Sequence, residues 1–177
     1  VPFTWQRTNR NLQAALTSSI AAGHFWARAR NLRFLRYIHR LDAETTGVLL
    51  FGKNKGAVQS LGRLFERGRI SKRYLAVVHG RPQAASWECT VGLGEVAGAP
   101  GRMCLDARHG KPSATRFNLL DTRGELALIE ARPLTGRTHQ IRLHLRHAGL
   151  PIVGDPLYGR PDADERLGLD CEKYPMG

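Results

Sequence analysis

The chain has 177 residues, 42% of them apolar and 24% charged, a composition typical of a globular protein and not of a disordered or fibrous one. No apolar run is long enough to cross a bilayer and no signal-peptide pattern precedes the first polar residues, so we expect a cytoplasmic protein without a membrane partner. Three widely spaced cysteines (Cys89, Cys104 and Cys171) form neither a disulfide framework nor a zinc motif and are expected to be free thiols.

The charge is strongly positive. The chain has 27 Lys and Arg residues, only five of which are Lys, and 15 Asp and Glu residues. Its net charge is therefore +12, and its pI is near 10.6. Arginine offers a planar fork of donors that suits phosphate oxygens, and here the arginines gather in residues 28–40 and 132–146. This pattern favours a nucleic-acid partner over a membrane. The alternative is a basic protein that is merely soluble, or an arginine-rich proteome.

The first half of the chain predicts two helices and one strand. The expected elements are a helix over 11–22, a basic loop with Phe25 and Trp26, a buried strand over 46–51, and a helix over 55–67. The second helix is the clearer one, because its apolar positions share one face (Val58, Leu61, Leu64 and Phe65).

The second half predicts a strand, a long loop, a hairpin and a helix. The expected ranges are a strand over 71–79, a glycine- and proline-containing loop over 93–112, and a hairpin over 115–131 with its turn at 121–124. Residues 135–149 read as a helix that begins at Thr135 as N-cap and ends at Gly149.

Projection of that last helix separates its polar side chains. Ile141, Leu145 and Ala148 form an apolar stripe, and Arg137 and His144 fall on or beside it. An arginine on the core side of a first turn requires a carboxylate partner. The opposite side carries His139, Arg142 and Arg146, and its arginines are predicted to face solvent or RNA.

One carboxylate stands out in this basic chain. Asp42 follows Arg40 at the mouth of the predicted buried strand, where an acidic group is costly unless it is paired. Taken alone it would be read as a helix cap or a surface ion pair. Chemistry is the other explanation, since functional sites often hold such groups.

Four motifs occur in order along the chain: HRLDAETTGVLLFGKN from His39, KRYLAVVHG from Lys72, GRTHQIRLHL from Gly136, and GDPLYG from Gly154. Together they resemble the RluA-type pseudouridine synthases, which isomerise uridine in ribosomal or transfer RNA. The related RsuA-type branch has a glycine in the place of His39.

The resemblance implies roles for individual residues. The implied catalytic residues are Asp42 as nucleophile, Tyr74 as the active-site tyrosine, and Arg137 as the cation that pairs with the aspartate. Contacts to RNA are expected from a further set of basic residues: Arg40, Lys72, Arg142, Arg30 and Arg33. Without the flanking Lys72 and Ala76, Tyr74 would be read as a half-buried strand aromatic. No cofactor and no metal is implied.

The implied fold is α+β, with a mixed, largely antiparallel central sheet and flanking helices, in one catalytic domain over 1–177. Relatives carry a strand with a Lys-Pro motif shortly before the equivalent of Val1 and an apolar strand after that of Gly177. The sequence is therefore expected to be a core trimmed at both ends.

Two alternative functions stay open. One is a non-catalytic RNA-binding module derived from such an enzyme. The other is an RNA-cleaving enzyme that uses His139 or His144 as general acid and base. A metal site at His139, His144 and His147 is disfavoured because the projection sends His139 and His144 to different sides. Asp155, in the last motif, is predicted to support a turn by accepting backbone amides.

Overall fold

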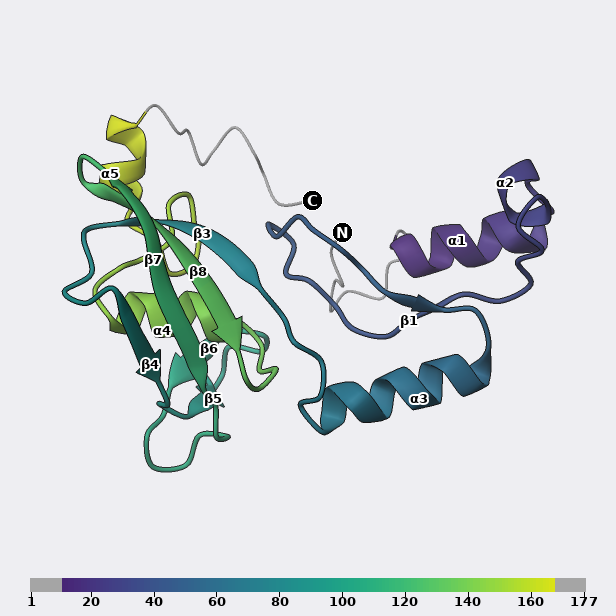
Figure 1. Cartoon of the computed structure of the whole chain (residues 1–177), viewed down its shortest axis with the longest axis horizontal. Coiled ribbons are helices and arrows are strands. Elements are labelled where there is room, and N and C mark those ends of the chain that lie inside the picture. The colour runs from purple at the N-terminus through teal and green to yellow at the C-terminus, as the bar shows by residue number, and fades with distance from the viewer. Residues whose placement is uncertain (1–10, 168–177) are drawn as a thin grey trace. The chain divides into compact units, whose positions relative to one another are not determined.

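The computed structural model of the chain describes residues 11–167 (Figure 1). Its contacts form two compact units, unit 1 over residues 1–70 and unit 2 over residues 71–177, and the single domain over 1–177 stays a prediction. No helix in the described part is long and apolar enough to span a membrane. Cys89 and Cys104 are free thiols as predicted, and Cys171 lies outside the described residues.

Unit 1 contains three helices and a short pair of strands among its described residues. They are α1 (Leu12–Ala21), α2 (Phe25–Arg28), β1 (Arg36–Tyr37), β2 (Phe51–Gly52) and α3 (Lys55–Glu66). The two predicted helices are confirmed, and each begins at an asparagine whose side chain accepts a backbone N–H. Asn11 accepts from Ala14 at 2.9 Å, and Asn54 accepts from Ala57 at 2.7 Å.

The prediction of a buried strand over 46–51 is wrong. Strand β2 begins only at Phe51 and pairs with β1 over two residues, while Val48 is 77% exposed and Leu50 is 38% exposed. Gly47 adopts a φ of 144°, which interrupts an extended run. The apolar residues before Phe51 therefore belong to a loop. The basic loop predicted after α1 is also corrected, since it contains α2.

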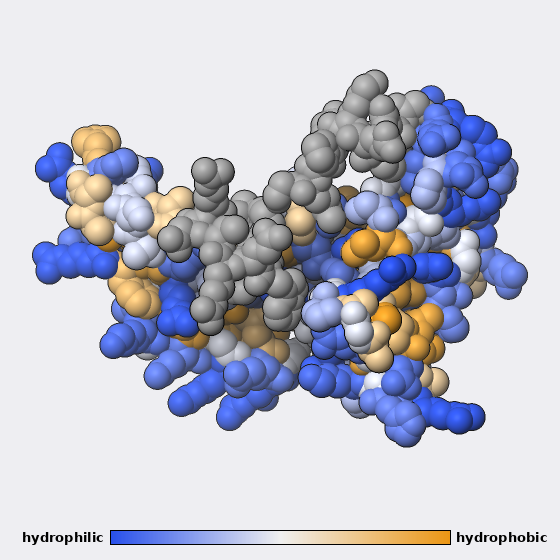
Figure 2. Space-filling view, turned by 180° about the vertical axis from the view of Figure 1, so that it is seen from behind, coloured by the Kyte–Doolittle hydropathy of each residue, from blue (hydrophilic) through white to orange (hydrophobic). Residues whose placement is uncertain are grey.

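Helix α3 is amphipathic, as its sequence predicts. Figure 2 shows hydrophilic side chains along the lower edge of unit 1, where this helix lies. Its inner side approaches β2 so closely that a Cβ on Gly52 would lie 2.6 Å from Cγ2 of Val58. A glycine at this position lets the helix pack directly on the strand.

Unit 2 is built on an antiparallel sheet of four strands in the order β3-β8-β7-β4. Its elements are β3 (Tyr74–His79), β4 (Ser86–Cys89), β5 (Leu93–Glu95), β6 (Met103–Leu105), β7 (Thr115–Arg123), β8 (Leu126–Pro133), α4 (Gln140–His147) and α5 (Pro161–Arg166). The predicted strand and hairpin are confirmed. The hairpin turn lies later than predicted, at residues 124–125, with Gly124 at a φ of 59°.

The segment predicted as a loop over 93–112 is partly ordered as strands. Strands β5 and β6 pair antiparallel, and Leu93 also bridges to Lys111. The glycines that indicated a loop allow close backbone approach instead: a Cβ on Gly92 would lie 2.7 Å from the carbonyl oxygen of Asp106. This small hairpin closes a second apolar cluster with Leu143 and Tyr158.

The main core of unit 2 lies between one face of the sheet and α4 (Figure 1). Phe117 and Ile129 from the sheet and Leu145 from α4 are fully buried there. On this face the side chains alternate with residues that point to the opposite face of the sheet. The core thus fixes α4 against β7 and β8.

Helix α4 is shorter at its start than predicted. Its N-cap is His139, at a left-handed φ of 54°, and not Thr135. Its end is confirmed: Gly149 has a φ of 75°, its N–H bonds to Arg146, and the N–H of Leu150 bonds to Leu145. This is the Schellman arrangement that stops a helix.

We predict that Phe117→Ala destabilises the protein by about 3–5 kcal/mol, because the ring is fully buried between sheet and helix. Leu120→Ala on β7 is the control, since this side chain is 49% exposed and its loss costs at most about 0.5 kcal/mol. Urea unfolding followed by circular dichroism measures both. Equal midpoints for the two variants would contradict this assignment of the core.

Candidate active site

Asp42 lies in the loop between β1 and β2 of unit 1, with its side chain half-buried. Its backbone carbonyl accepts the N–H of Thr45 at 3.0 Å, which closes a backbone turn over residues 42–45. The end of the loop is held by His39, whose Nε2 accepts the N–H of Leu50 at 3.2 Å and whose ring stacks on Phe65 at 5.1 Å. The loop therefore has fixed ends on α3 and β2.

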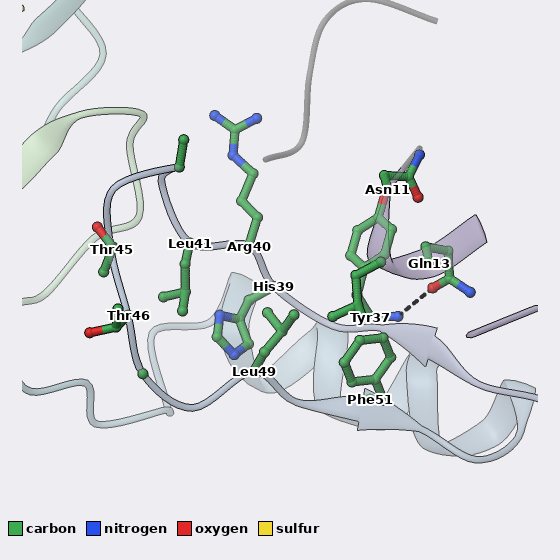
Figure 3. A pocket seen from close by; sticks show the side chains of 13 residues that line it. Asn11, Gln13, Tyr37, His39, Arg40, Leu41, Thr45, Thr46, Leu49 and Phe51 are labelled. Carbon is green, nitrogen blue, oxygen red and sulfur yellow. Dashed lines mark hydrogen bonds between the residues drawn. The ribbon is translucent and has the colours of Figure 1, made fainter. Parts of the chain in front are cut away.

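A glutamine from α1 holds the other side of this loop. Gln13 Nε2 donates to the carbonyl of Leu35 at 2.7 Å, and Gln13 Oε1 accepts the N–H of Tyr37 at 3.1 Å (Figure 3). One side chain thus satisfies backbone groups of β1 and of the residue before it, much as a neighbouring strand would. Sequence reasoning missed Gln13, because nothing local distinguishes it from a solvent-facing helix residue.

A pocket of about 330 Å³ opens beside the Asp42 loop. Its lining comes from the start of α1, from β1 and β2, and from the loop on both sides of Asp42. The lining residues are Asn11, Leu12, Gln13, Tyr37, His39, Arg40, Leu41, Ala43, Thr45, Thr46, Gly47, Leu49 and Phe51. In Figure 3 the guanidinium of Arg40 points away from the rings of His39 and Phe51. Arg40 is exposed, and its contact with RNA stays a prediction.

In unit 2, Lys72 and Tyr74 stand at the start of β3. Lys72 Nζ donates to the carbonyl of Thr135 at 2.8 Å, and burial lowers the pKa of its ammonium group. Tyr74 pairs with Ala131 of β8 and packs against the core, half-buried. The structure therefore brings Lys72 against the segment that immediately precedes Arg137.

Gln140 shapes that segment. Its Oε1 accepts the hydroxyl of Thr135 at 2.7 Å and the N–H of Arg137 at 2.9 Å, and its Nε2 donates to Ala114 and Thr115 at 2.9 Å. These bonds explain why Thr135 does not cap α4: its hydroxyl is used by Gln140, and it also accepts the N–H of Ala114. Gln140 was missed, although its spacing of four residues from His144 places it on the core side.

Arg137 is exposed, with Nε donating to the carbonyl of Pro112 at 3.1 Å. The prediction that it falls in a first turn on the core side of α4 is therefore wrong, since the helix begins after it. Its pairing with Asp42 stays a prediction, because Asp42 belongs to unit 1 and Arg137 to unit 2.

The prediction that Arg142 faces solvent or RNA is wrong. Arg142 is buried and binds Asp155 through two bonds of 2.7 Å, from Nε to Oδ2 and from Nη2 to Oδ1. Its guanidinium also lies 5.0 Å from the ring centre of Tyr158. Helical projection failed here because the partner carboxylate comes from a separate turn of the chain.

Asp155 supports its turn as predicted. Oδ1 accepts the N–H groups of Leu157 at 2.9 Å and Tyr158 at 3.0 Å. Burial alone would raise the pKa of this carboxyl, but the bonds and charge of Arg142 and the backbone donors together hold the pKa below its usual value.

The histidines of this region are structural in their geometry. His144 is fully buried, hydrogen-bonded at 3.0 Å to Ser113 and Thr115, and burial lowers its pKa. It cannot reach an RNA, which weighs against RNA cleavage by His144. His139 Nδ1 bonds to the hydroxyl of Tyr158 at 2.9 Å. In residues 11–167 no group of three His, Cys, Asp or Glu side chains is placed to hold a metal ion.

We predict that Asp155→Asn destabilises the fold by about 3–5 kcal/mol, because Arg142 then lacks its carboxylate in a buried position. The folded pKa of Asp155 lies below the unfolded value of about 3.9, so its stabilisation is present above that pH and is lost as the pH falls through the folded pKa. Unfolding measured from neutral to acid pH should therefore show the two proteins converging in acid. The exposed Asp162→Asn is the control, expected to cost less than about 1 kcal/mol. A constant difference at all pH values would contradict the assignment.

Comparison with known proteins identifies the family. The sequence model described as RNA pseudouridylate synthase matches residues 23–147. The ribosomal large subunit pseudouridine synthase C of Yersinia pestis is 40% identical over 136 residues, which cover 76% of this chain and 42% of the relative. The protein of the same name from Escherichia coli (strain K12) is 39% identical over 137 residues, covering 76% and 43%.

A solved structure agrees with the sequence match. The human RNA pseudouridylate synthase domain containing 1 is 34% identical, with a TM-score of 0.68 over 79% of this chain and 61% of that chain. The chain spans less than half the length of the curated relatives it matches. The family match covers more than half of the sequence, both strand-rich and loop segments included, and the chain belongs to the RNA pseudouridylate synthase family.

Proposed function

We propose that the protein converts uridine to pseudouridine in structured RNA. The observation that carries this proposal is that one family match, over residues 23–147, includes Asp42, Tyr74 and Arg137 together. The expected α+β fold with an antiparallel sheet is present, and the solved relatives share it. The names of the relatives favour ribosomal RNA over transfer RNA as the substrate.

The reaction breaks the bond between ribose C1′ and uracil N1 and forms a bond between C1′ and C5. The proton on C5 is lost and N1 gains a proton, so no redox change and no co-reactant is required. In the proposal Asp42 supplies the nucleophile, and an ionised carboxylate is required for that role. Arg137 would favour the ionised form and orient it. The half-buried position of Asp42 in a hydrogen-bonded turn supports this, since the turn fixes the backbone that carries the carboxylate.

Tyr74 is proposed to contact the uracil. Its ring offers a face for stacking and its hydroxyl can accept or relay a proton. The position at the first residue of β3 supports the proposal, because a strand end combines a fixed backbone with an accessible side chain. Lys72 is proposed to contact the RNA from the same strand start, and its bond to Thr135 orients it. Arg142 is left out because it is buried and binds Asp155 through two of its donors.

The target nucleotide must leave its stack to reach Asp42, and unstacking costs a few kcal/mol. Phosphate contacts are proposed to offset this cost. Arg40, Arg30 and Arg33 are exposed in unit 1, and Arg30 Nη1 bonds to the carbonyl of Trp26 at 3.3 Å. These side chains are therefore proposed to hold the RNA backbone around the extruded uridine.

We predict that Asp42→Ala abolishes pseudouridine formation, with a loss on the order of 10³-fold or more, while RNA binding is retained. Pseudouridine is measured by chemical labelling and primer extension on ribosomal RNA. Glu44→Ala is the matched control, since it removes an exposed acid from the same loop and should stay active. Product from Asp42→Ala at the unmutated rate would overturn the mechanism. RNA binding without any product from the unmutated protein would favour the non-catalytic binding module.

We predict that Arg30→Gln/Arg33→Gln weakens RNA binding and flattens its dependence on salt. With each phosphate contact that is lost, binding releases fewer counterions from the RNA. The measurement is the Kd for a labelled RNA hairpin across a KCl series. The slope of log K against log salt should fall by roughly one for each phosphate contact removed. An unchanged slope would remove these residues from the RNA-binding surface.

A further inference from the structure

Three arginines lie in a row across the sheet face opposite α4. Arg116 of β7 stands directly opposite Arg132 of β8 in the antiparallel pair. Arg73 precedes Tyr74, the residue opposite Ala131, so Arg73 lies beside Arg132. Their sequence neighbours Phe117 and Ala131 are fully buried in the core, and alternation along a strand therefore directs the arginines to the other face.

A buried carboxylate fixes two of these arginines. Glu130 is only 4% exposed. Its Oε1 accepts a hydrogen bond from Nε of Arg132 at 2.8 Å, and its Oε2 forms an ion pair with Arg73, 2.7 Å from Nε. Asn118 Nδ2 adds a bond of 3.2 Å to Oε1. These bonds and the charges of both arginines hold the pKa of Glu130 below its usual value, with the bond from Arg132 as the largest cause. Glu130 therefore stays ionised and orients both guanidinium groups.

The third arginine is held in the same manner. Arg116 Nε donates to Oε2 of Glu88 at 2.9 Å, and Glu88 stands opposite it on β4. The side chains of Arg73, Arg116 and Arg132 remain 66%, 63% and 52% exposed. Arg116 and Arg132 are hydrogen-bonded through Nε and Arg73 is ion-paired at Nε, and the Nη nitrogens of all three make no hydrogen bond to any residue in the range 11–167. The Nη nitrogens of the three guanidinium groups are thus held in position, and their N–H groups can donate to a bound anion.

The charges of the row do not cancel. Like charges directly opposite each other on neighbouring strands are destabilising, and Arg116 and Arg132 form such a pair. Glu130 and Glu88 leave one positive charge in excess over the three arginines. One arginine is enough to neutralise Glu130, so the second arginine beside it leaves a positive charge without a carboxylate of its own. An anion bound at this face would balance that charge.

We propose that Arg73, Arg116 and Arg132 form a second anion site that binds the phosphodiester backbone of the RNA, on the sheet face opposite α4. This rests on the proposed function, since RNA is the polyanion that the chain is inferred to act on. Guanidinium groups bind phosphate oxygens in bidentate fashion, and three strands place the row across roughly 10 Å. Leu75, 60% exposed on the same face, gives an apolar surface beside the row for a ribose or base. The site extends the RNA contact beyond the target nucleotide.

The test compares RNA affinity across a KCl series for matched variants of the whole chain. Arg116→Gln removes one fork and leaves only the partly exposed Glu88, so the fold is expected to persist. The triple variant Arg73→Gln/Glu130→Gln/Arg132→Gln removes the other two forks and replaces the buried carboxylate with a neutral amide. Arg81→Gln is the control: Arg81 is exposed and held through Nε by the carbonyl of Gly124 at 2.9 Å, but lies at the other end of β3. Circular dichroism verifies the fold of each protein.

We expect Arg116→Gln and the triple variant each to bind a labelled RNA hairpin several-fold more weakly. Each should also flatten the slope of log K against log salt, by roughly one unit for Arg116→Gln, while Arg81→Gln has a smaller effect. Affinity and slope equal to those of the Arg81→Gln control would overturn the inference. So would variants that bind RNA normally and instead lose binding to polyglutamate, which would assign the row to an acidic protein.

Pseudouridine formation at saturating RNA is measured in parallel. Absence of product in the unmutated protein refutes the proposed function alone, and the RNA affinities still decide whether the row is a phosphate site.

Discussion

The ion pair between Arg142 and Asp155 is the interaction on which the arrangement of unit 2 depends. It joins the middle of α4 to the turn that carries Tyr158, and Tyr158 in turn bonds to Met103 of β6 through its hydroxyl. Helix, turn and small hairpin are thus held by one buried polar contact. A buried pair of this kind stabilises only when both partners are present and their remaining bonds are made.

The position of α4 then determines the segment before it. Gln140, in the first turn, binds Thr135 and the backbone of Arg137, and Lys72 binds the carbonyl of Thr135 from β3. Arg137 itself is exposed, so its location depends on this backbone and not on packing of its own side chain. The buried polar residues of unit 2 therefore contribute to the candidate site indirectly, because they fix the loop that carries the exposed Arg137.

The sequence predicted best those features that depend on local signals. The two longer helices of unit 1, the glycine that ends α4 and the turn-rich residues of the β7–β8 hairpin are each visible within a few residues. The candidate catalytic residues came from the resemblance of four motifs, and periodicity alone would not have selected them. What failed depends on distant partners. The sequence predicts a solvent-facing Arg142 because the carboxylate that binds it, Asp155, lies 13 residues away in another turn.

The prediction of a strand over 46–51 also failed because a buried strand depends on neighbours that are distant in the sequence. An apolar run predicts a buried strand only if neighbours cover it, and β2 has a two-residue partner in β1. In the described part of unit 1, neither α1 nor α3 has a buried side chain, whereas unit 2 has a closed core. Segments with few buried apolar contacts open at lower free energy than a core does. The proposed nucleophile Asp42 thus stands in the unit with fewer buried apolar side chains among its described residues, between segments held by hydrogen bonds of Gln13 and His39. In the proposed mechanism the nucleotide enters beside this loop, whereas the pairing of β3 with β8, which orients Lys72 and Tyr74, belongs to the other unit.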